Sequence, residues 1–372
     1  MSVAQYRLYL NGTAATKDQL ARFEDITIEQ EMDRACYGRF QVPVCVCASG
    51  VWSGETDAFL QGMSRIRLEM QIQSGDWVAL IDGPIINVEA AQHSEPGQSM
   101  LTLVVSDDSF YLHRDETVTS FEGADSDVAS QIFDQVSQIS TTDIDTADTT
   151  SNPGFTKTVL RGTQMEFLQQ LAKRQHMHAY VTPGDKPGKS VGHFKHDPDP
   201  GKDYGLAPMV LLGTDTNIFS FKSATKAGQT ATFQTGQVNL KDRSTDTQTS
   251  NVSDVSLAGS ALPPGPTIKR LLRPGQMDAL TLARAVQGAT EKAAYALKAS
   301  GEVMKGVYSS VLQPYQFVQV RGANGTLSGK WLLHQVTHTI TRNSYGQSFQ
   351  VIRNATSAGT NSPLPGIPSS VF

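Results

Sequence analysis

Four histidines lie close together in the middle of the sequence, and three aspartates accompany them. They are His176, His178, His193 and His196, with Asp197, Asp199 and Asp203. Imidazole and carboxylate groups are ligands of zinc. However, His176 and His178 follow a predicted helix, where a separation of two residues does not place both on one face, and the helix dipole alone favours histidine at such an end. Because no standard zinc spacing is met, we predict no metal site.

The segment from Gly184 to Ser190 resembles a phosphate-binding loop. Such a loop needs four residues between its glycines, so that backbone N–H groups can surround the phosphates. Here three residues separate Gly184 from Gly188, and one of them, Pro187, has no N–H. No helical pattern follows. We therefore predict a hairpin turn and no nucleotide cofactor.

The three cysteines, Cys36, Cys45 and Cys47, are odd in number and clustered. One intervening residue places Cys45 and Cys47 on opposite faces of a strand, which disfavours a shared metal. We expect buried free cysteines. The N-terminus shows no basic segment followed by an apolar one, so we expect no secretory signal. Folding in a reducing cytoplasm without a disulfide framework is the consequence.

Other candidates for chemistry give no site either. His334 and His338 lie on one predicted strand, about 13 Å apart, too far to share a ligand, so we interpret them as sheet-face histidines. No serine-hydrolase elbow, zinc-protease motif or papain-type cysteine context occurs. The sequence contains many pairs of aspartate and glutamate, but none can be identified as a glycosidase dyad, because such a dyad is defined by the distance between two carboxyl groups in space. We predict no catalytic, cofactor-binding or metal-binding residues, and a protein that is not an enzyme.

The composition limits the classes of protein to consider. The chain has 372 residues, of which 39% are hydrophobic, so it can form two or three domains with real cores. Lys and Arg total 31 against 36 Asp and Glu, a net charge of −5, which argues against a chain-wide basic face for nucleic acid. No apolar stretch approaches the roughly 20 residues of a membrane helix, so we expect no membrane anchor.

The first hundred residues alternate between apolar and polar residues, which predicts antiparallel strands joined by turns such as Asn11-Gly12. The predicted strands include Tyr6–Leu10, Asp25–Asp33, Phe40–Val46, Arg65–Gln73, Trp77–Ala90 and Ser99–Ser106. One face of the strand Asp25–Asp33 carries four carboxylates. That face must contact water, because unpaired buried carboxylates are very costly.

The pattern changes after residue 113. Helical spacing occurs over Asp125–Ile139, and a second helix begins at Thr163, which forms a capping box with Glu166. Residues 140–156 and 242–268 are predicted to be loops. The other predicted elements are a hairpin of Ala179–Thr182 with Val191–Lys195, an alanine-rich helix over Ala279–Ala299, and a β-meander of Phe317–Arg321, Trp331–Arg342 and Gln347–Arg353.

The order of several segments and the residues within them resemble the late-control gene D family of phage tail proteins. That family includes the central hub of contractile-tail baseplates and the hub part of VgrG-type spikes. The resemblance covers roughly residues 1–355. It is carried by Gly62–Gln73, Asp82-Gly83-Pro84-Ile85-Ile86, Leu101–Arg114, Asp127–Ile132, Arg161–Ala172, Leu312–Val320, Leu327–Trp331 and Val336-Thr337-His338.

The resemblance implies a β-rich α+β protein with two tail-tube-like antiparallel β-barrel domains and an α+β insertion domain. Residues 1–113 would form the first barrel, and residues 213–240 plus 306–355 the second, discontinuous one. The insertion would comprise 114–212 plus 241–305. Residues 356–372 form a tail rich in Pro, Ser and Gly without a core pattern. Because its apolar Ile367 and Phe372 gain from burial, we expect it to contact a neighbour in the particle, in the first place the spike protein, and the alternative is a frayed terminus.

The implied function is a structural one, as a homotrimeric adaptor that joins a sixfold tail tube to a threefold spike. The implied partners are the tail tube or a tube-initiator protein, other baseplate proteins and the tape measure protein. Because the sequence stops at Phe372, we expect the spike to be a separate polypeptide. DNA or cargo would pass through the lumen without sequence-specific binding. The protein would assemble in the host cytoplasm and reside in the virion baseplate or a phage-like particle.

Two further hypotheses accompany this one. Symmetry matching would require two similar barrels in each chain, and we expect the strands Asp25–Asp33 and Trp331–Arg342 to occupy comparable places in them. The alternatives to a hub are a baseplate-associated enzyme that degrades peptidoglycan and a carbohydrate-binding β-protein. The first needs a convergent acid pair in a cleft, and the second an aromatic-lined groove, which the 3 tryptophans disfavour.

Overall fold

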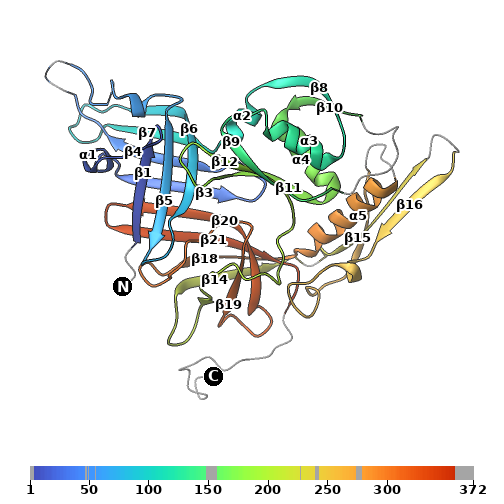
Figure 1. Ribbon diagram of the computed structural model, residues 1–372. Helices are drawn as coiled ribbons and strands as arrows, with labels where there is room; N and C mark the ends of the chain where they lie inside the picture. Colours follow the sequence, from blue (N-terminus) through green and yellow to red (C-terminus); the bar gives the residue numbers. More distant parts are fainter. Residues whose placement is uncertain are drawn as a thin grey trace.

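The structure is a computed structural model. It describes residues 4–46, 48, 50–54, 56–147, 157–226, 228–238, 243–273 and 279–356. Strands dominate the described chain and the longer helices lie in two insertions (Figure 1), so the predicted β-rich α+β class is confirmed. No helix within these ranges is long and apolar enough to span a membrane.

The first part of the chain forms one half of a large antiparallel sheet. Its strands are β1 (Ala4–Leu10), β2 (Thr13–Ala14), β3 (Asp25–Glu31), β4 (Tyr37–Pro43), β5 (Arg65–Ile72), β6 (Val78–Ala91) and β7 (Met100–Ser106), with the short helices α1 (Lys17–Leu20) and η1 (Ala58–Leu60) between them. Buried and exposed side chains alternate along β3 and β4, as the sequence pattern predicts. The buried set, including Leu8, Ile28, Phe40 and Ile66, forms one core.

The last part of the chain forms the other half. Its strands are β13 (Met209–Val210), β14 (Ile218–Thr225), β18 (Leu297–Val303), β19 (Phe317–Arg321), β20 (Gly329–Thr341) and β21 (Ser344–Arg353). Trp331, Leu333, Val336 and Phe349 are buried in a second core. Each half therefore has a core of its own, and Ile340 of β20 adds to the core of the first half.

The two halves have the same strand order. In the first half the neighbours are β1-β5-β6-β7-β4-β3, and in the second they are β13-β19-β20-β21-β18-β14. Counted along the chain without the two-residue β2, both orders begin with the first strand, continue through the fourth, fifth and sixth, and end on the third and second. The pairing of the first strand differs, since β1 pairs with β5 antiparallel whereas β13 pairs with β19 parallel.

A single antiparallel pairing, here called the seam, joins the halves. In the seam β3 lies beside the C-terminal part of β20, with Ile28 opposite His338 and Ile26 opposite Ile340. The expectation that these two strands occupy comparable places is wrong. Strand β3 is the second of its half and corresponds to β14, whereas β20 is the fifth and corresponds to β6.

The first insertion lies between the halves and has its own core, which includes Val128, Phe133, Leu168 and Phe194. The predicted capping box is confirmed, because the Glu166 N–H donates to Thr163 Oγ1 at 3.3 Å and the Thr163 N–H donates to Glu166 Oε2 at 3.4 Å. The elements are α2 (Ser109–His113), β8 (Glu116–Glu122), α3 (Asp125–Phe133), β9 (Ile139–Ile144), β10 (Lys157–Thr163), α4 (Gln164–Gln175), β11 (Met177–Pro183) and β12 (Ser190–His196).

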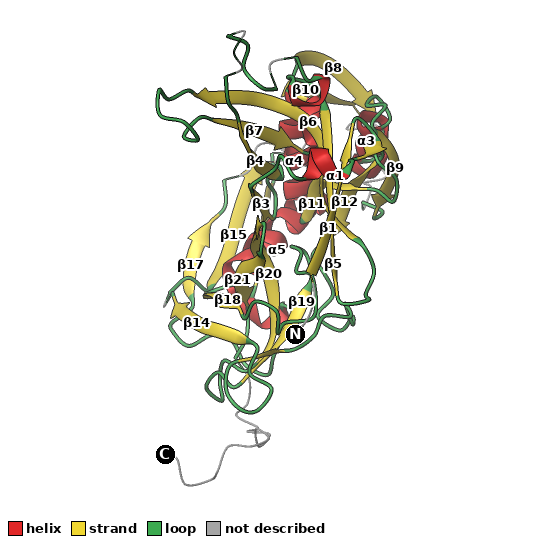
Figure 2. Cartoon of the chain, turned by 90° about the vertical axis from the view of Figure 1, so that its left-hand side faces the viewer, coloured by secondary structure: helices red, strands yellow, loops and turns green. Residues whose placement is uncertain are grey.

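The second insertion lies between β14 and β18, where the first half has only the turn between β3 and β4 (Figure 2). It consists of β15 (Ala231–Val238), β16 (Thr245–Ser250), η3 (Val252–Asp254), β17 (Ile268–Leu271) and α5 (Ala279–Ala294). Helix α5 packs on β15 and β16.

Two strand pairings differ from the predicted boundaries. The resemblance places residues 231–238 in the second barrel, but β15 pairs with β16 and β17 in a small separate sheet. It places residues 297–303 in the insertion, but β18 pairs with β14 and β21. The reason is that the alanine-rich helix ends at Ala294, before the alternating segment of β18 begins. The division into domains itself stays a prediction.

The backbone packs closely around Gly83 in β6, and a substitution there tests this packing. A Cβ at Gly83 in β6 would lie 1.8 Å from the carbonyl oxygen of Ser106, which is backbone and cannot rotate away. We expect Gly83→Ala to lower the free energy of unfolding by about 1–3 kcal/mol through overpacking. Gly62→Ala is the matched control, because nothing lies within 4 Å of the added carbon there. Denaturant unfolding of both variants measures this, and equal stabilities would contradict the expectation.

Candidate functional site

Two of the open strand edges in the described part of the chain belong to β6 and β14 of the large sheet. Residues Asn87–Ala91 of β6 pair with β7 on one side, and no described strand pairs with their other side. The outer edge of β14 is likewise open, since its described partner is β18 alone. Side chains from Asn87 to Ala91 and from Lys222 to Thr225 are exposed. Open edges of this length are sites for strand addition.

A bulge at the same place in both halves defines which residues correspond. Ile86 in β6 and His334 in β20 are the extra residues, each flanked by regular pairs. In the first half Ile85 pairs with Val105, Val105 pairs with Gly38, and Gly38 pairs with Ile28. In the second half Leu333 pairs with Val351, Val351 pairs with Ala299, and Ala299 pairs with Ser223, so Ser223 corresponds to Ile28. The open edge of β6 therefore corresponds to the paired edge of β20, and the open β14 corresponds to β3.

The water-facing side of β3 is as predicted. Asp25 and Glu29 are exposed, and Glu31 is half-buried, while Ile26 and Ile28 point into the core.

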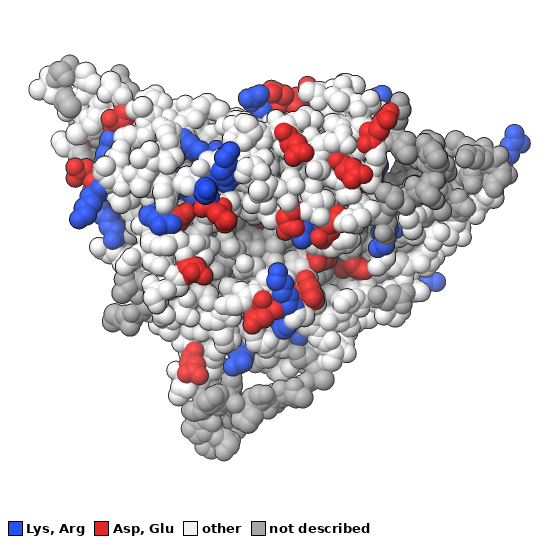
Figure 3. Space-filling model, viewed as in Figure 1, with Lys and Arg blue, Asp and Glu red and all other residues white. Residues whose placement is uncertain are grey.

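Acidic and basic side chains are mixed over the face of the molecule in Figure 3, so that face carries no field of a single sign.

Two of the clustered histidines meet at the junction of the two halves and the insertion. His178 Nε2 lies 2.5 Å from Asp197 Oδ1, and its Nδ1 lies 2.6 Å from Asp33 Oδ1, at the end of β3. Burial lowers the pKa of His178, but the hydrogen bonds and charges of Asp197 and Asp33 outweigh burial and raise this pKa to about 9. Tyr315 of the second half closes the junction, because its hydroxyl accepts from the Asp33 N–H at 2.7 Å.

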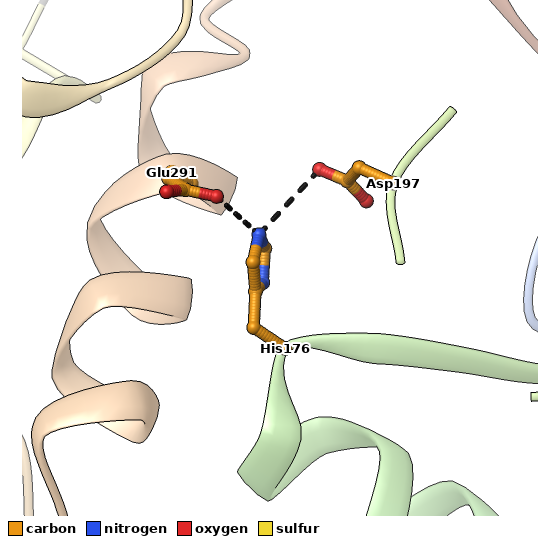
Figure 4. A group of neighbouring side chains, drawn as sticks. All are labelled: His176, Asp197 and Glu291. Atoms are coloured by element: carbon orange, nitrogen blue, oxygen red, sulfur yellow. Dashed lines mark ion pairs between the residues drawn. The ribbon is translucent and has the colours of Figure 1, made fainter. Parts of the chain in front are cut away.

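His176 shares Asp197 with His178. Its Nε2 lies 3.6 Å from Asp197 Oδ2 and contacts Glu291 Oε2 of α5 (Figure 4). The three donor atoms all lie within 4.8 Å of one another. The structure thus brings together residues from three separate elements, which spacing along the sequence does not reveal.

The other two histidines lie apart from this group. His193 stacks on Tyr180 with ring centroids 4.5 Å apart, and its Nε2 lies 2.8 Å from Thr182 Oγ1. Burial is the main reason that the pKa of His193 is lowered to about 4. His196 is exposed beside Asp145. The four histidines do not form one site.

The segment Gly184–Ser190 is the predicted hairpin turn, between β11 and β12. It also contacts the first half of the sheet, which the sequence did not reveal. The carbonyl of Gly184 accepts from Arg67 Nη1 at 2.7 Å, the Gly188 N–H donates to Asp82 Oδ2 at 2.9 Å, and Ser190 Oγ donates to Asp108 Oδ2 at 2.6 Å.

Buried ion pairs lie beneath this turn. Arg65 Nε is 2.6 Å from Asp82 Oδ1, and two further nitrogens of Arg65 bond both oxygens of Asp108 at 2.8 and 2.6 Å. Arg67 contacts Asp82 at 3.1 Å and Glu69 at 2.6 Å. Asp82 and Asp108 have no exposed side-chain surface. This network positions the insertion on the sheet.

The remaining candidates have structural surroundings. Cys36 is a buried free thiol, as expected, but Cys45 is exposed, so the expectation of burial is wrong there because β4 ends at Pro43. His338 is buried in the seam, whereas the bulge leaves His334 half-buried. Cys47 and the tail beyond Thr356 lie outside the described residues.

Neither a family model nor a curated protein sequence matches the chain. Solved structures do. A tail protein from Neisseria meningitidis MC58 is similar over 94% of this chain and 96% of its own, with a TM-score of 0.61 and 14% identity. A tail protein of the prophage MuSo2 from Shewanella oneidensis is similar over 95% of this chain and all (100%) of its own, with a TM-score of 0.60 and 14% identity.

A third similar structure comes from a secretion system. It is an Escherichia coli component of the type VI secretion system, itself described as similar to T4 bacteriophage tail proteins. It matches 93% of this chain and 76% of its own, with a TM-score of 0.54 and 11% identity. With its two like halves and an insertion between them, the chain has the fold of these phage tail proteins.

Proposed function

We propose that the protein is the central hub of the baseplate of a contractile phage tail or of a phage-like injection system. It would join the tail tube to a separate spike protein, contact other baseplate proteins and line part of the channel for DNA or cargo. The fold shared with tail proteins supports a structural role, and we propose no catalytic activity. The proposed location is the virion baseplate or the corresponding particle.

The repeated strand order carries the proposal. A hub between a sixfold tube and a threefold spike has to present both symmetries. Three chains with two like halves each offer six similar units around one axis, and closed cyclic symmetry is the usual arrangement of identical subunits. We therefore propose a homotrimer.

The seam supplies a template for the contact between copies. Inside the chain β20 pairs with β3, and the corresponding strands β6 and β14 have open edges. If β6 of one copy pairs with β14 of the next copy in the register of the seam, Ala90 lies opposite Ser223 and Glu89 lies opposite Ala224. Lys222 and Lys226 then become the diagonal neighbours of Glu89, and opposite charges at such positions attract. The pairing satisfies both edges and closes the ring.

Cysteine cross-linking tests this register. In a Cys45→Ser, Cys47→Ser background, Ala90→Cys with Ser223→Cys places two thiols directly opposite each other, within the Cα separation that a disulfide allows. Oxidation of assembled particles is expected to give covalent trimers on a non-reducing gel. Ala90→Cys with Ala224→Cys is the matched control, because its thiols would lie on opposite faces of the sheet. Equal cross-linking in both variants, or none in either, contradicts the proposed contact.

Particle imaging tests the hub itself. A reconstruction of the tail is expected to show three copies at the axis, between the tube and the spike. A single copy or six copies at the axis would exclude the homotrimer, and a position away from the axis would exclude the hub.

A further inference from the structure

We propose that His176, Asp197 and Glu291 bind a divalent transition metal ion, with zinc as the best fit. The inference does not depend on the proposed function of the protein. It also departs from the sequence-based expectation that the chain has no metal ligand. That expectation rested on spacing along the chain, whereas the three residues are brought together by the fold.

The donor atoms converge from three elements. His176 lies directly after α4 in the left-handed conformation, with φ 56°, which turns its ring out of the helix. Asp197 follows β12, and Glu291 lies on α5 (Figure 4). One nitrogen and two oxygens lie within 4.8 Å of one another. Zinc bonds of about 2.0–2.2 Å to nitrogen and oxygen need donors roughly 3–3.5 Å apart. His176 Nε2 and Glu291 Oε2, which are now in direct contact, would move apart to admit the ion, and Asp197 Oδ2, now 3.6 Å from Nε2, would move slightly inward.

The outer oxygens of both carboxylates are already held. His178 Nε2 lies 2.5 Å from Asp197 Oδ1, and Gln287 Nε2 donates to Glu291 Oε1 at 2.8 Å. These contacts leave Oδ2 and Oε2 directed at His176 Nε2. Such outer contacts orient the ligands of protein-bound metals. The cluster therefore has both an inner set of donors and the supports that metal sites use.

The charge of the surroundings favours a cation. With His176 as a neutral ligand, the carboxylates of Asp33, Asp197 and Glu291 carry three negative charges. The positive charges nearby come from exposed Lys292 and from His178, which together contribute at most two. The site is therefore net negative in either protonation state of His178. A divalent ion fits this balance.

Helix α5 is shaped to admit the imidazole. A Cβ at position 288 would lie 2.7 Å from His176 Nδ1, so Gly288 allows the ring to approach the helix backbone. The three side chains are 20%, 27% and 19% exposed, which lets an ion enter from solvent and leaves a position for water. An imidazole with two carboxylates suits zinc better than magnesium or calcium, which prefer oxygen ligands alone. A bound ion would tie α5 of the second insertion to α4 of the first.

Titration of the full chain with zinc chloride tests the site. Calorimetry is expected to show one ion per chain, and zinc is expected to raise the melting temperature more than magnesium does. Glu291→Gln keeps the size of the side chain and its hydrogen bond to Gln287, but should weaken zinc binding at least tenfold. His196→Gln is the matched control, because it removes an exposed histidine of the same domain and should leave the affinity unchanged.

Two results would overturn the proposal. One is the lack of saturable binding near one equivalent, and the other is equal affinity in Glu291→Gln and the unmodified chain. X-ray absorption at the zinc edge of the unmodified chain decides the matter even if the variant fails to fold. One imidazole with oxygen neighbours supports the site, whereas sulfur or several imidazoles place the ion elsewhere.

Discussion

Replacing Asp82 with alanine is expected to lower the free energy of unfolding by about 3–5 kcal/mol, the usual cost of breaking a buried ion pair. Asp82 accepts from Arg65 at 2.6 Å, from Arg67 at 3.1 Å and from the Gly188 N–H at 2.9 Å. Its side chain has no exposed surface, and that of Arg67 is 4% exposed. In Asp82→Ala, Arg65 keeps Asp108 and Arg67 keeps Glu69, but the cluster loses one carboxylate, so its buried positive charge is no longer fully balanced.

Denaturant unfolding measures this loss, and amide exchange locates it. Since the Gly188 N–H donates to Asp82, its exchange should accelerate more than that of neighbouring amides if the turn between β11 and β12 detaches. Asp82→Asn separates shape from charge, because it retains an acceptor of the same size, and we expect an intermediate loss. Arg34→Ala breaks a pair whose arginine is 72% exposed and should change stability too little to resolve. Equal effects of Asp82→Ala and Arg34→Ala would refute the structural role of this network.

Acid is expected to weaken the seam through His338. This residue has no exposed surface, and its Nδ1 lies 2.8 Å from the Tyr345 hydroxyl and its Nε2 3.3 Å from Gln30 Oε1. Burial lowers its pKa to about 3. In the unfolded chain the pKa is near the ordinary value of about 6.5, so the unfolded state takes up a proton that the folded state refuses as the pH falls. The folded state therefore loses about 2 kcal/mol between pH 7 and pH 5 through this group.

The quantity to measure is the free energy of unfolding at pH 7 and at pH 5, in the unmodified chain and in His338→Gln. His338→Gln removes the titrating group, so the loss of stability from pH 7 to pH 5 should be about 2 kcal/mol smaller than in the unmodified chain. The half-buried His193 contributes equally to both proteins, so its effect cancels in the difference. An identical pH dependence in His338→Gln and the unmodified chain would show that His338 does not resist protonation.

The local elements were visible in the sequence wherever one side of an element is buried. Alternation along β3 and β4 marked them as strands, and the Thr163–Glu166 capping box marked the start of α4. Where burial does not alternate, the sequence misled. Strand β9 has four consecutive exposed residues and was predicted as a loop. The helix predicted for Asp125–Ile139 ends at Phe133, although Val136 and Ile139 beyond it are still buried in the same core.

Long-range pairing was less accessible. The seam joins β3 near the start of the chain to β20 near its end, and no short-range pattern specifies that contact. The same holds for the cluster of His176, Asp197 and Glu291, whose members lie after a helix, after a strand and within another helix. Spacing rules describe ligands on one element, so they excluded a site that three elements build together. The strand order common to both halves could not be predicted from the sequence either, because it depends on which strands pair with each other, and the local pattern of a strand does not specify its partner.

The seam has a consequence for how a closed ring of three chains would come together. Of six contacts between neighbouring units in such a ring, three are β3–β20 contacts inside single chains and form during folding. Linking two units in one polypeptide gives each a high effective concentration for the other, which does not change when the protein is diluted. Only the remaining three contacts depend on encounters between chains. Fusion of two like units thus reduces a six-body assembly to a three-body one and lowers the protein concentration at which the ring closes.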